Sequence, residues 1–264
     1  MTGLVRSLRS FHRRRIAIPV GPDDLVLDIG SGDKPHWRAD VLLDRFLGAE
    51  HGGQRSGRAA ARVSRPLFDA DAAAMPFADG AFDFVVCSHV LEHVPDPGAV
   101  VAEMARVSAA GYIEVPEAAS AKILDFPSHL WWCRLDGTTL VMTAKQQPAF
   151  DTEIKAFIDA TGIERRLADL LDDDFDRRIV ALPWTGRPDV RVEGRPSADL
   201  VAAALATDSH HRVGQDVAAR VLTSLLTVPR RRQRRHRPIL LDDVLRPELR
   251  TGTGEVLTRR VYRY

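Results

Sequence analysis

The densest group of residues able to do chemistry is His89, Glu92 and His93, which are spaced i, i+3 and i+4. If this segment begins a helix, as we expect, all three side chains lie on one face. A neutral histidine there can take a proton from an acceptor hydroxyl. The same side chains can instead hold a divalent metal that acidifies an acceptor oxygen. In a third interpretation Glu92 and His93 only cap and brace the helix, and all three interpretations stay open at this point.

A second chemical feature is the glycine turn Asp28-Ile29-Gly30-Ser31-Gly32. Such a turn brings backbone amides close to a nucleotide-like ligand. A dinucleotide fingerprint needs a third glycine at position 35, where this chain has Pro35. The carboxylate of Asp28 would also repel a pyrophosphate and attract an ammonium group. The turn therefore favours a ligand with an ammonium group over a dinucleotide.

The sequence predicts that short strands, alternating with helical segments, position these residues. We expect strands over residues 24–29, 39–43, 66–68, 82–87 and 111–115, and a helix over residues 99–107. This alternation predicts an α/β fold with a doubly wound, mostly parallel sheet. Ligands bind such sheets outside the carboxyl ends of the strands. The polar residues at those ends are the glycine turn, Asp44, Asp71, Ser88 and His89.

Three segments in this order resemble class I S-adenosylmethionine (SAM)-dependent methyltransferases. Residues 26–32 are similar to motif I of that class, and residues 71–83 to its stretch from the third strand to the fourth. Residues 87–94 resemble a Leu-Glu-His-Val segment frequent in the type 11 subgroup. The resemblance covers residues 24–117 and implies a seven-stranded Rossmann-like fold with SAM as cofactor.

The resemblance also implies roles for single residues. Asp28, Gly30, Ser31 and Gly32 would line the methionine end of SAM. Asp44 would accept both ribose hydroxyls, and Asp71 with the amide of Ala72 would meet the adenine edge. Ser88 and His89 would lie beside the sulfonium. Acids also commonly end strands as turn formers, so Asp44 and Asp71 have this plainer interpretation too.

The metal interpretation is weakened by one substitution. Residues 89–93 resemble the Glu-x-x-Glu-His ligand sets of magnesium-dependent ubiquinone-biosynthesis and small-RNA O-methyltransferases, but His89 replaces the first glutamate. A histidine ligand suits zinc or manganese better than magnesium. We therefore expect no metal, with His89 as the catalytic base and His93 as a second catalytic residue.

Beyond residue 117 the resemblance fades and only element predictions remain. We expect a strand over residues 140–143, one or two helices over 152–171, a hairpin of 178–184 with 189–192, and helices over 198–206 and 213–226. The aromatic stretch Phe126–Trp132 can wall an acceptor pocket or pack in the core. The predicted domains are a basic N-terminal helix (1–22), a SAM-binding domain (23–195) and a partly helical, less regular C-terminal extension (196–264).

Composition restricts the class of protein further. The chain has 264 residues, a net charge of +1 and two cysteines. Two cysteines are too few for a disulfide framework, which favours a reducing cytoplasm. No apolar run is long enough to span a bilayer. Two basic segments, the loop with His51, Arg55, Arg58, Arg62 and Arg65 and the run 230–237, can grip an anion or phosphate backbone, but we expect the run to be a solvated linker.

The sequence therefore predicts a SAM-dependent methyltransferase that modifies a small-molecule or sugar-bearing acceptor at oxygen. The alternatives are an RNA methyltransferase that uses the Arg-rich segment, a SAM-fold protein that binds without turnover, and an NAD-linked oxidoreductase, which Pro35 disfavours. No nucleic acid or membrane partner is expected.

Overall fold

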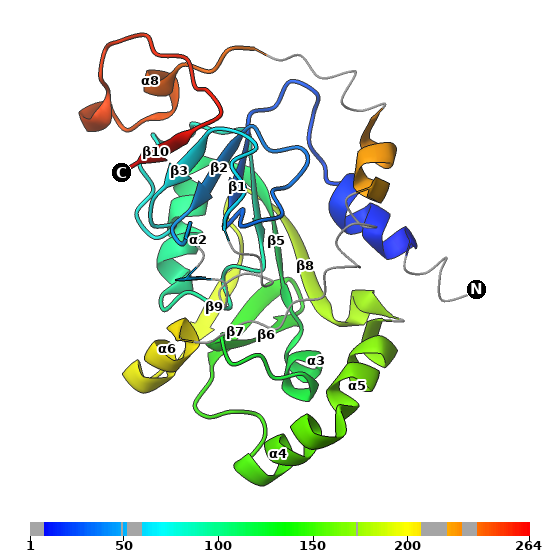
Figure 1. Ribbon diagram of the computed structural model, residues 1–264. Coiled ribbons are helices and arrows are strands. Elements are labelled where there is room, and N and C mark those ends of the chain that lie inside the picture. Colours follow the sequence, from blue (N-terminus) through cyan, green and yellow to red (C-terminus); the bar gives the residue numbers. More distant parts are fainter. Residues whose placement is uncertain (1–7, 49, 52–59, 173, 207–220, 229–236) are drawn as a thin grey trace.

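The centre of the protein is a seven-stranded sheet with strand order β10-β3-β2-β1-β4-β5-β8 (Figure 1). The computed structural model describes residues 8–48, 50–51, 60–172, 174–206, 221–228 and 237–264. All neighbouring strands run parallel except β8, which is antiparallel to β5. The predicted doubly wound, mostly parallel α/β fold is confirmed. The strands are β1 (Val26–Ile29), β2 (Val41–Asp44), β3 (Leu67–Asp69), β4 (Phe84–Ser88), β5 (Ala110–Pro116), β8 (Ile179–Thr185) and β10 (Val261–Arg263).

The inner strands are apolar because helices and loops cover both faces of the sheet. Every residue of β1 and β2 is buried. On one face their side chains join a core cluster with helix α2 (Pro97–Val107), whose Val100 and Met104 are fully buried. This packing holds the carboxyl ends of β1, β2 and β4 next to one another.

The sequence predicts that a helix begins at the His89–His93 segment, but helix α2 begins only at Pro97. Residues 91–93 form a turn, and the helix starts at Pro97 with the Asp96 side chain accepting from the amide of Ala99. Pro95 disfavours a helical conformation for the residue before it, while proline is well suited to the first helical position. The helix-start interpretation of residues 89–93 is therefore wrong, and Glu92 does not cap the helix.

A second, three-stranded sheet has the order β6-β7-β9. Its strands are β6 (Trp131–Asp136), β7 (Thr139–Ala144) and β9 (Val190–Glu193). The predicted hairpin of residues 178–184 with 189–192 is wrong, because β8 pairs with β5 and β9 pairs with β7 in parallel. Each of these strands satisfies its backbone groups on the edge of a different sheet, and the turn at Gly186 carries the chain between the two sheets.

The remaining helices surround the second sheet and the edges of the first (Figure 1). The predicted 152–171 helix is two helices, α4 and α5, because Gly162 adopts a left-handed conformation with φ 61° between them. Residues 8–11 are helical and continue into η1, and residues 221–228 are helical, whereas 213–220 lie outside the described residues. The helical elements are η1 (His12–Ile16), α3 (Ala118–Ile123), α4 (Thr152–Thr161), α5 (Ile163–Asp172), η3 (Phe175–Arg177), α6 (Ala198–Leu205), α8 (Leu241–Val244) and η4 (Pro247–Leu249).

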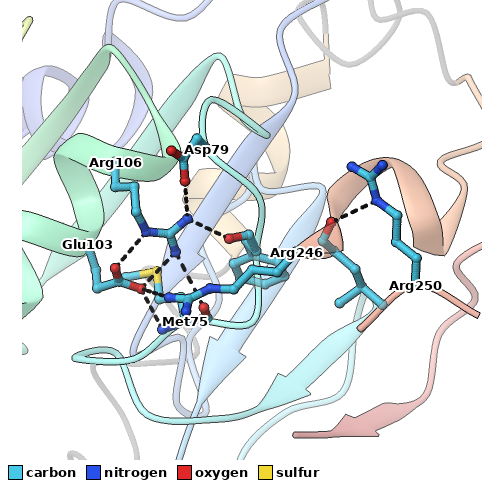
Figure 2. A network of polar contacts seen from close by, with 8 residues as sticks. Met75, Asp79, Glu103, Arg106, Arg246 and Arg250 are labelled. Atoms are coloured by element: carbon cyan, nitrogen blue, oxygen red, sulfur yellow. Dashed lines mark hydrogen bonds and ion pairs between the residues drawn. The ribbon is translucent and has the colours of Figure 1, made fainter. Parts of the chain in front are cut away.

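The C-terminal segment completes the large sheet, which the sequence does not predict. Arg246 donates to the carboxylate of Glu103 on α2 at 2.9 Å, and Arg106 pairs with the same carboxylate (Figure 2). From this anchor the chain returns to place β10 parallel to β3. The predicted domain boundaries at residues 22/23 and 195/196 stay predictions.

Candidate functional site

The glycine turn is clamped between the end of β2 and the segment after β4. The amide of Gly30 donates to the Leu43 carbonyl at 2.7 Å, and the amide of Gly32 donates to the Asp44 carboxylate at 2.8 Å. Gly30 has φ 65°, and a Cβ placed on it would lie 2.3 Å from Cγ2 of Val90. Only glycine fits there, because the conformation is left-handed and the neighbour is too close.

Asp28 lies buried at the end of β1, directly before the turn. Its carboxylate accepts from the amide of His36 at 2.7 Å. Burial raises the pKa of Asp28 to about 7, although the hydrogen bond from His36 and the charge of Arg15 act in the opposite direction. A cation that binds beside such a buried carboxyl group lowers its pKa and stabilises the anion.

Asp44 and Asp71 stand at the ends of neighbouring strands. Asp44 is buried and accepts from the amides of Gly32 and Phe46 at 2.8 and 2.9 Å. Asp71 accepts from the amide of Ala73 at 2.9 Å and forms an ion pair with Arg45. Both acids therefore form the turn contacts of the plainer interpretation. This does not exclude a ligand, because each carboxylate oxygen has two lone pairs.

His89 is the only non-glycine residue with positive φ in the described chain, at φ 57°. Residues held in this region are often positioned for function. Its Nδ1 lies 3.1 Å from Glu92 and its Nε2 3.2 Å from Glu114. Burial lowers the pKa of His89, but the hydrogen bonds to Glu114 and Glu92 outweigh this effect and raise the pKa to about 9. The ring is therefore a cation at pH 7, and the predicted neutral base is not the state that these contacts favour.

Glu114 on β5 is a site residue that the sequence reasoning missed. Both of its oxygens bind the guanidinium of Arg14, which comes from the N-terminal helix, and Oε2 also accepts from the Tyr112 hydroxyl at 2.7 Å. Ser88 Oγ lies 3.4 Å from Oε1. Burial raises the pKa of Glu114, but His89 and Arg14 together hold it well below its usual range. The available signal was a glutamate inside an otherwise apolar strand.

A second histidine cluster lies beside His89. Nδ1 of His93 lies 3.0 Å from the Ser128 carbonyl, and its ring meets that of His129 edge-on at 4.8 Å between centroids. Glu92 is completely buried, and His129 is nearly so. Burial lowers the pKa of His93 and holds that of His129 well below its ordinary value. Both rings are therefore neutral at pH 7.

The aromatic stretch after α3 divides between two environments. Trp131 is buried in the core and donates from its indole to the Val94 carbonyl at 2.8 Å. Trp132 instead lines a mostly apolar hollow of about 650 Å³ with residues of α3, α4 and α5. The core interpretation therefore applies to Trp131, and the acceptor-pocket interpretation stays a prediction for Trp132.

Comparison with known proteins covers the first five strands of the large sheet. Residues 27–113 match the methyltransferase domain family model. An uncharacterized methyltransferase of Mycobacterium sp. (strain KMS) is 36% identical over 99 residues, which are 34% of this chain and 36% of that protein. The demethylmenaquinone methyltransferase of Renibacterium salmoninarum is 37% identical over 108 residues, 38% of this chain and 44% of that protein. Residues 27–113 are therefore similar to a methyltransferase domain.

The chain spans less than half the length of these curated relatives. A solved SAM-dependent methyltransferase from Methanosarcina mazei is 20% identical, with a TM-score of 0.29 over 48% of this chain and 71% of that one. The methyltransferase domain contains every residue predicted to bind the cofactor, together with His89 and His93. Glu114, its partner Arg14, and His129, which contacts His93, lie outside the matched residues.

The structure describes only part of the two basic segments predicted from the sequence. Arg55, Arg58 and residues 230–236 of the basic run lie outside the described residues, and Arg62 donates from its amide to the Gly32 carbonyl at 2.8 Å. Among the helices described, none combines the length and apolar character needed to cross a bilayer.

Proposed function

We propose that this chain is an enzyme that transfers a methyl group from SAM to an oxygen of a small-molecule or sugar-bearing acceptor. The observation that carries the proposal is the junction of the glycine turn with Asp44, inside a methyltransferase domain. It holds Asp28, the turn and Asp44 at the adjacent carboxyl ends of β1 and β2.

The residues present suit the chemical groups of SAM. Asp28 is a buried carboxyl group whose anion is stabilised by a cation, and the amino group of the methionine end is such a cation. Asp44 has carboxylate lone pairs for the ribose hydroxyls, and Asp71 with Ala72 lies one strand further along, where the adenine edge would be met. Ser31 would face the methionine end with the two glycines.

When bound, SAM supplies an electrophilic methyl group on its sulfonium. The chain's part is to hold an acceptor oxygen in line with that methyl, which is the main source of rate in such a transfer. Ser88 and His89 are the proposed residues beside the sulfonium, and Glu92 and Glu114 fix the His89 ring by hydrogen bonds. His93 is the proposed residue that takes the acceptor's proton, because Ser128 engages Nδ1 and leaves Nε2 as an acceptor.

The hollow beside Trp132 is the proposed binding place of the acceptor. Its lining is mostly apolar and aromatic, with Lys122 as a cationic group near the Trp132 ring. A ring or sugar can stack on such a wall.

Calorimetric titration with S-adenosylhomocysteine and, separately, with NAD tests the cofactor. We expect S-adenosylhomocysteine to bind and NAD not to bind. Incubation with SAM and a small-molecule extract should then release S-adenosylhomocysteine, detected by mass spectrometry. Binding of NAD alone would contradict the proposal, and cofactor binding without product from any extract or from RNA would favour a non-catalytic binding protein.

A further inference from the structure

Glu92, His93 and His129 form a compact group of possible metal ligands. Each offers one ligand atom, and these atoms all lie within 4.8 Å of one another. Ligand atoms around a tetrahedral zinc ion, with bonds of about 2.1 Å, lie about 3.4 Å apart. The separations would therefore have to close by at most about 1.4 Å when a zinc ion binds.

Two polar atoms in this group are buried without a hydrogen-bond partner among the described residues. They are Oε2 of Glu92 and Nδ1 of His129. Glu92 is completely buried and His129 is 7% exposed. Burying such groups unpaired is costly, and the cost falls if a cation binds both.

The backbone around the group is held in place. The amide of Leu130 donates to the Glu92 carbonyl at 2.7 Å, which joins the His129 segment to the Glu92–His93 turn. His93 is oriented by the Ser128 carbonyl on Nδ1 at 3.0 Å, so that its Nε2 is the ligating atom. Metal-binding histidines commonly have their other ring nitrogen fixed in this way.

We propose that Glu92, His93 and His129 bind one divalent transition-metal ion, zinc being the best match. Two imidazoles and one carboxylate form a ligand set found in catalytic zinc sites, which keep a fourth position for water or substrate. Histidine ligands disfavour magnesium and calcium, which prefer oxygen. This proposal differs from the sequence-based expectation of no metal, which considered His89 and not His129.

The site stands on these contacts and does not depend on methyl transfer. The other oxygen of Glu92 contacts His89, so a metal at Oε2 would lie next to the proposed transfer site. The metal ion would bind the Nε2 lone pair of His93, so that His93 could not also take the acceptor's proton. The metal would then assist loss of that proton, because it lowers the pKa of a bound hydroxyl.

The test is metal binding by protein prepared without a histidine tag. After removal of metal with a chelator, titration with zinc chloride against a chromophoric zinc indicator should show one tight equivalent per chain. Zinc should also raise the unfolding temperature, whereas magnesium should not. Glu92→Gln, which keeps the side-chain volume, and His129→Ala should each abolish the tight equivalent. The matched control His51→Ala should retain it.

Circular dichroism of the apo variants checks that they are folded. If folded Glu92→Gln and His129→Ala bind zinc as tightly as the wild type, the proposed ligands are wrong. If wild-type protein takes up no tight equivalent of zinc, manganese, iron(II) or cobalt, there is no such site. Neither result affects the S-adenosylhomocysteine titration, so the two proposals fail independently.

Discussion

The backbone amide of Gly32 donates a hydrogen bond of 2.8 Å to Oδ2 of Asp44, twelve residues later in the chain. The second oxygen of Asp44 accepts from Phe46 at 2.9 Å. One carboxylate thus joins the turn after β1 to the end of β2. In the proposed function, the same carboxylate holds the ribose, so its structural and binding roles can be separated by substitution.

Asp44→Asn should weaken S-adenosylhomocysteine binding strongly while leaving the fold intact. The amide keeps one acceptor oxygen for Gly32 but loses the charge and one acceptor for the hydroxyls. We expect about 1.5–3 kcal/mol of lost binding free energy, the range for hydrogen bonds to charged groups. Calorimetry measures the effect, with Asp136→Asn on the exposed end of β6 as the control. Unchanged affinity in Asp44→Asn would show that Asp44 is only a turn former.

Gly30→Ala should destabilise the protein more than Gly80→Ala. Both glycines have positive φ, 65° and 62°, so both variants carry the left-handed strain of about 1–2 kcal/mol. Only at Gly30 would the new Cβ meet a neighbour, Val90 at 2.3 Å, whereas nothing lies within 4 Å at Gly80. Overpacking adds about 1–3 kcal/mol.

Chemical denaturation of the two variants measures this difference directly. Adding Val90→Ala to Gly30→Ala should recover much of the additional loss, because it removes the clashing methyl groups. Equal destabilisation of the two single variants would mean that Val90 does not press on the turn.

Affinity for S-adenosylhomocysteine should fall as the pH drops below 7. Burial raises the pKa of Asp28 to about 7 in the protein without ligand, and the ligand's ammonium group favours the ionised carboxyl. Binding below pH 7 therefore releases a proton, and the dissociation constant should rise by up to about tenfold per pH unit.

Calorimetry in buffers of different ionisation enthalpy at pH 6 measures the proton release. Asp28→Asn should bind weakly with a flat profile between pH 5.5 and about 7.5, since residue 28 no longer titrates. A wild-type profile as flat as that of the variant would place the ammonium group away from Asp28.

Arg14→Met should destabilise the protein by about 3 kcal/mol, because it removes the guanidinium that binds both oxygens of the buried Glu114 carboxylate and leaves only the His89 ring beside it. The Arg14 side chain is 12% exposed and that of Glu114 is 4% exposed. The neighbouring Arg13 pairs with Asp176 and is 61% exposed, so Arg13→Met should cost less than about 1 kcal/mol. Urea denaturation measures the stability of both variants. A similar loss of stability in both would contradict a specific stabilising ion pair between Arg14 and Glu114.

The same pair predicts how stability depends on pH. Since the folded-state pKa of Glu114 is depressed, its stabilising contribution is present above the ordinary glutamate pKa and is lost as the pH falls below it. Glu114→Gln should therefore flatten the stability profile of the protein below about pH 4.5, which denaturation at several pH values measures.

The local pattern of residues was enough to predict the first five strands and the turn. Buried parallel strands are continuous apolar runs, and a strand followed by Gly-x-Gly with acids at the next strand ends is visible in consecutive letters. The same reasoning failed at residues 178–192, where two strands with a turn between them look like a hairpin. Which edge each strand joins depends on backbone partners far away in the chain.

The sequence by itself determined the fold class and the carboxyl-end residues of β1 to β4, because these depend on local periodicity and short motifs. Only the tertiary structure decided what surrounds His89. It brought Arg14 to Glu114 from the N-terminal helix, placed His129 against His93, and paired β10 with β3. These contacts join residues with no common spacing, and their energies come from burial and charge pairing that exist only once the chain has folded.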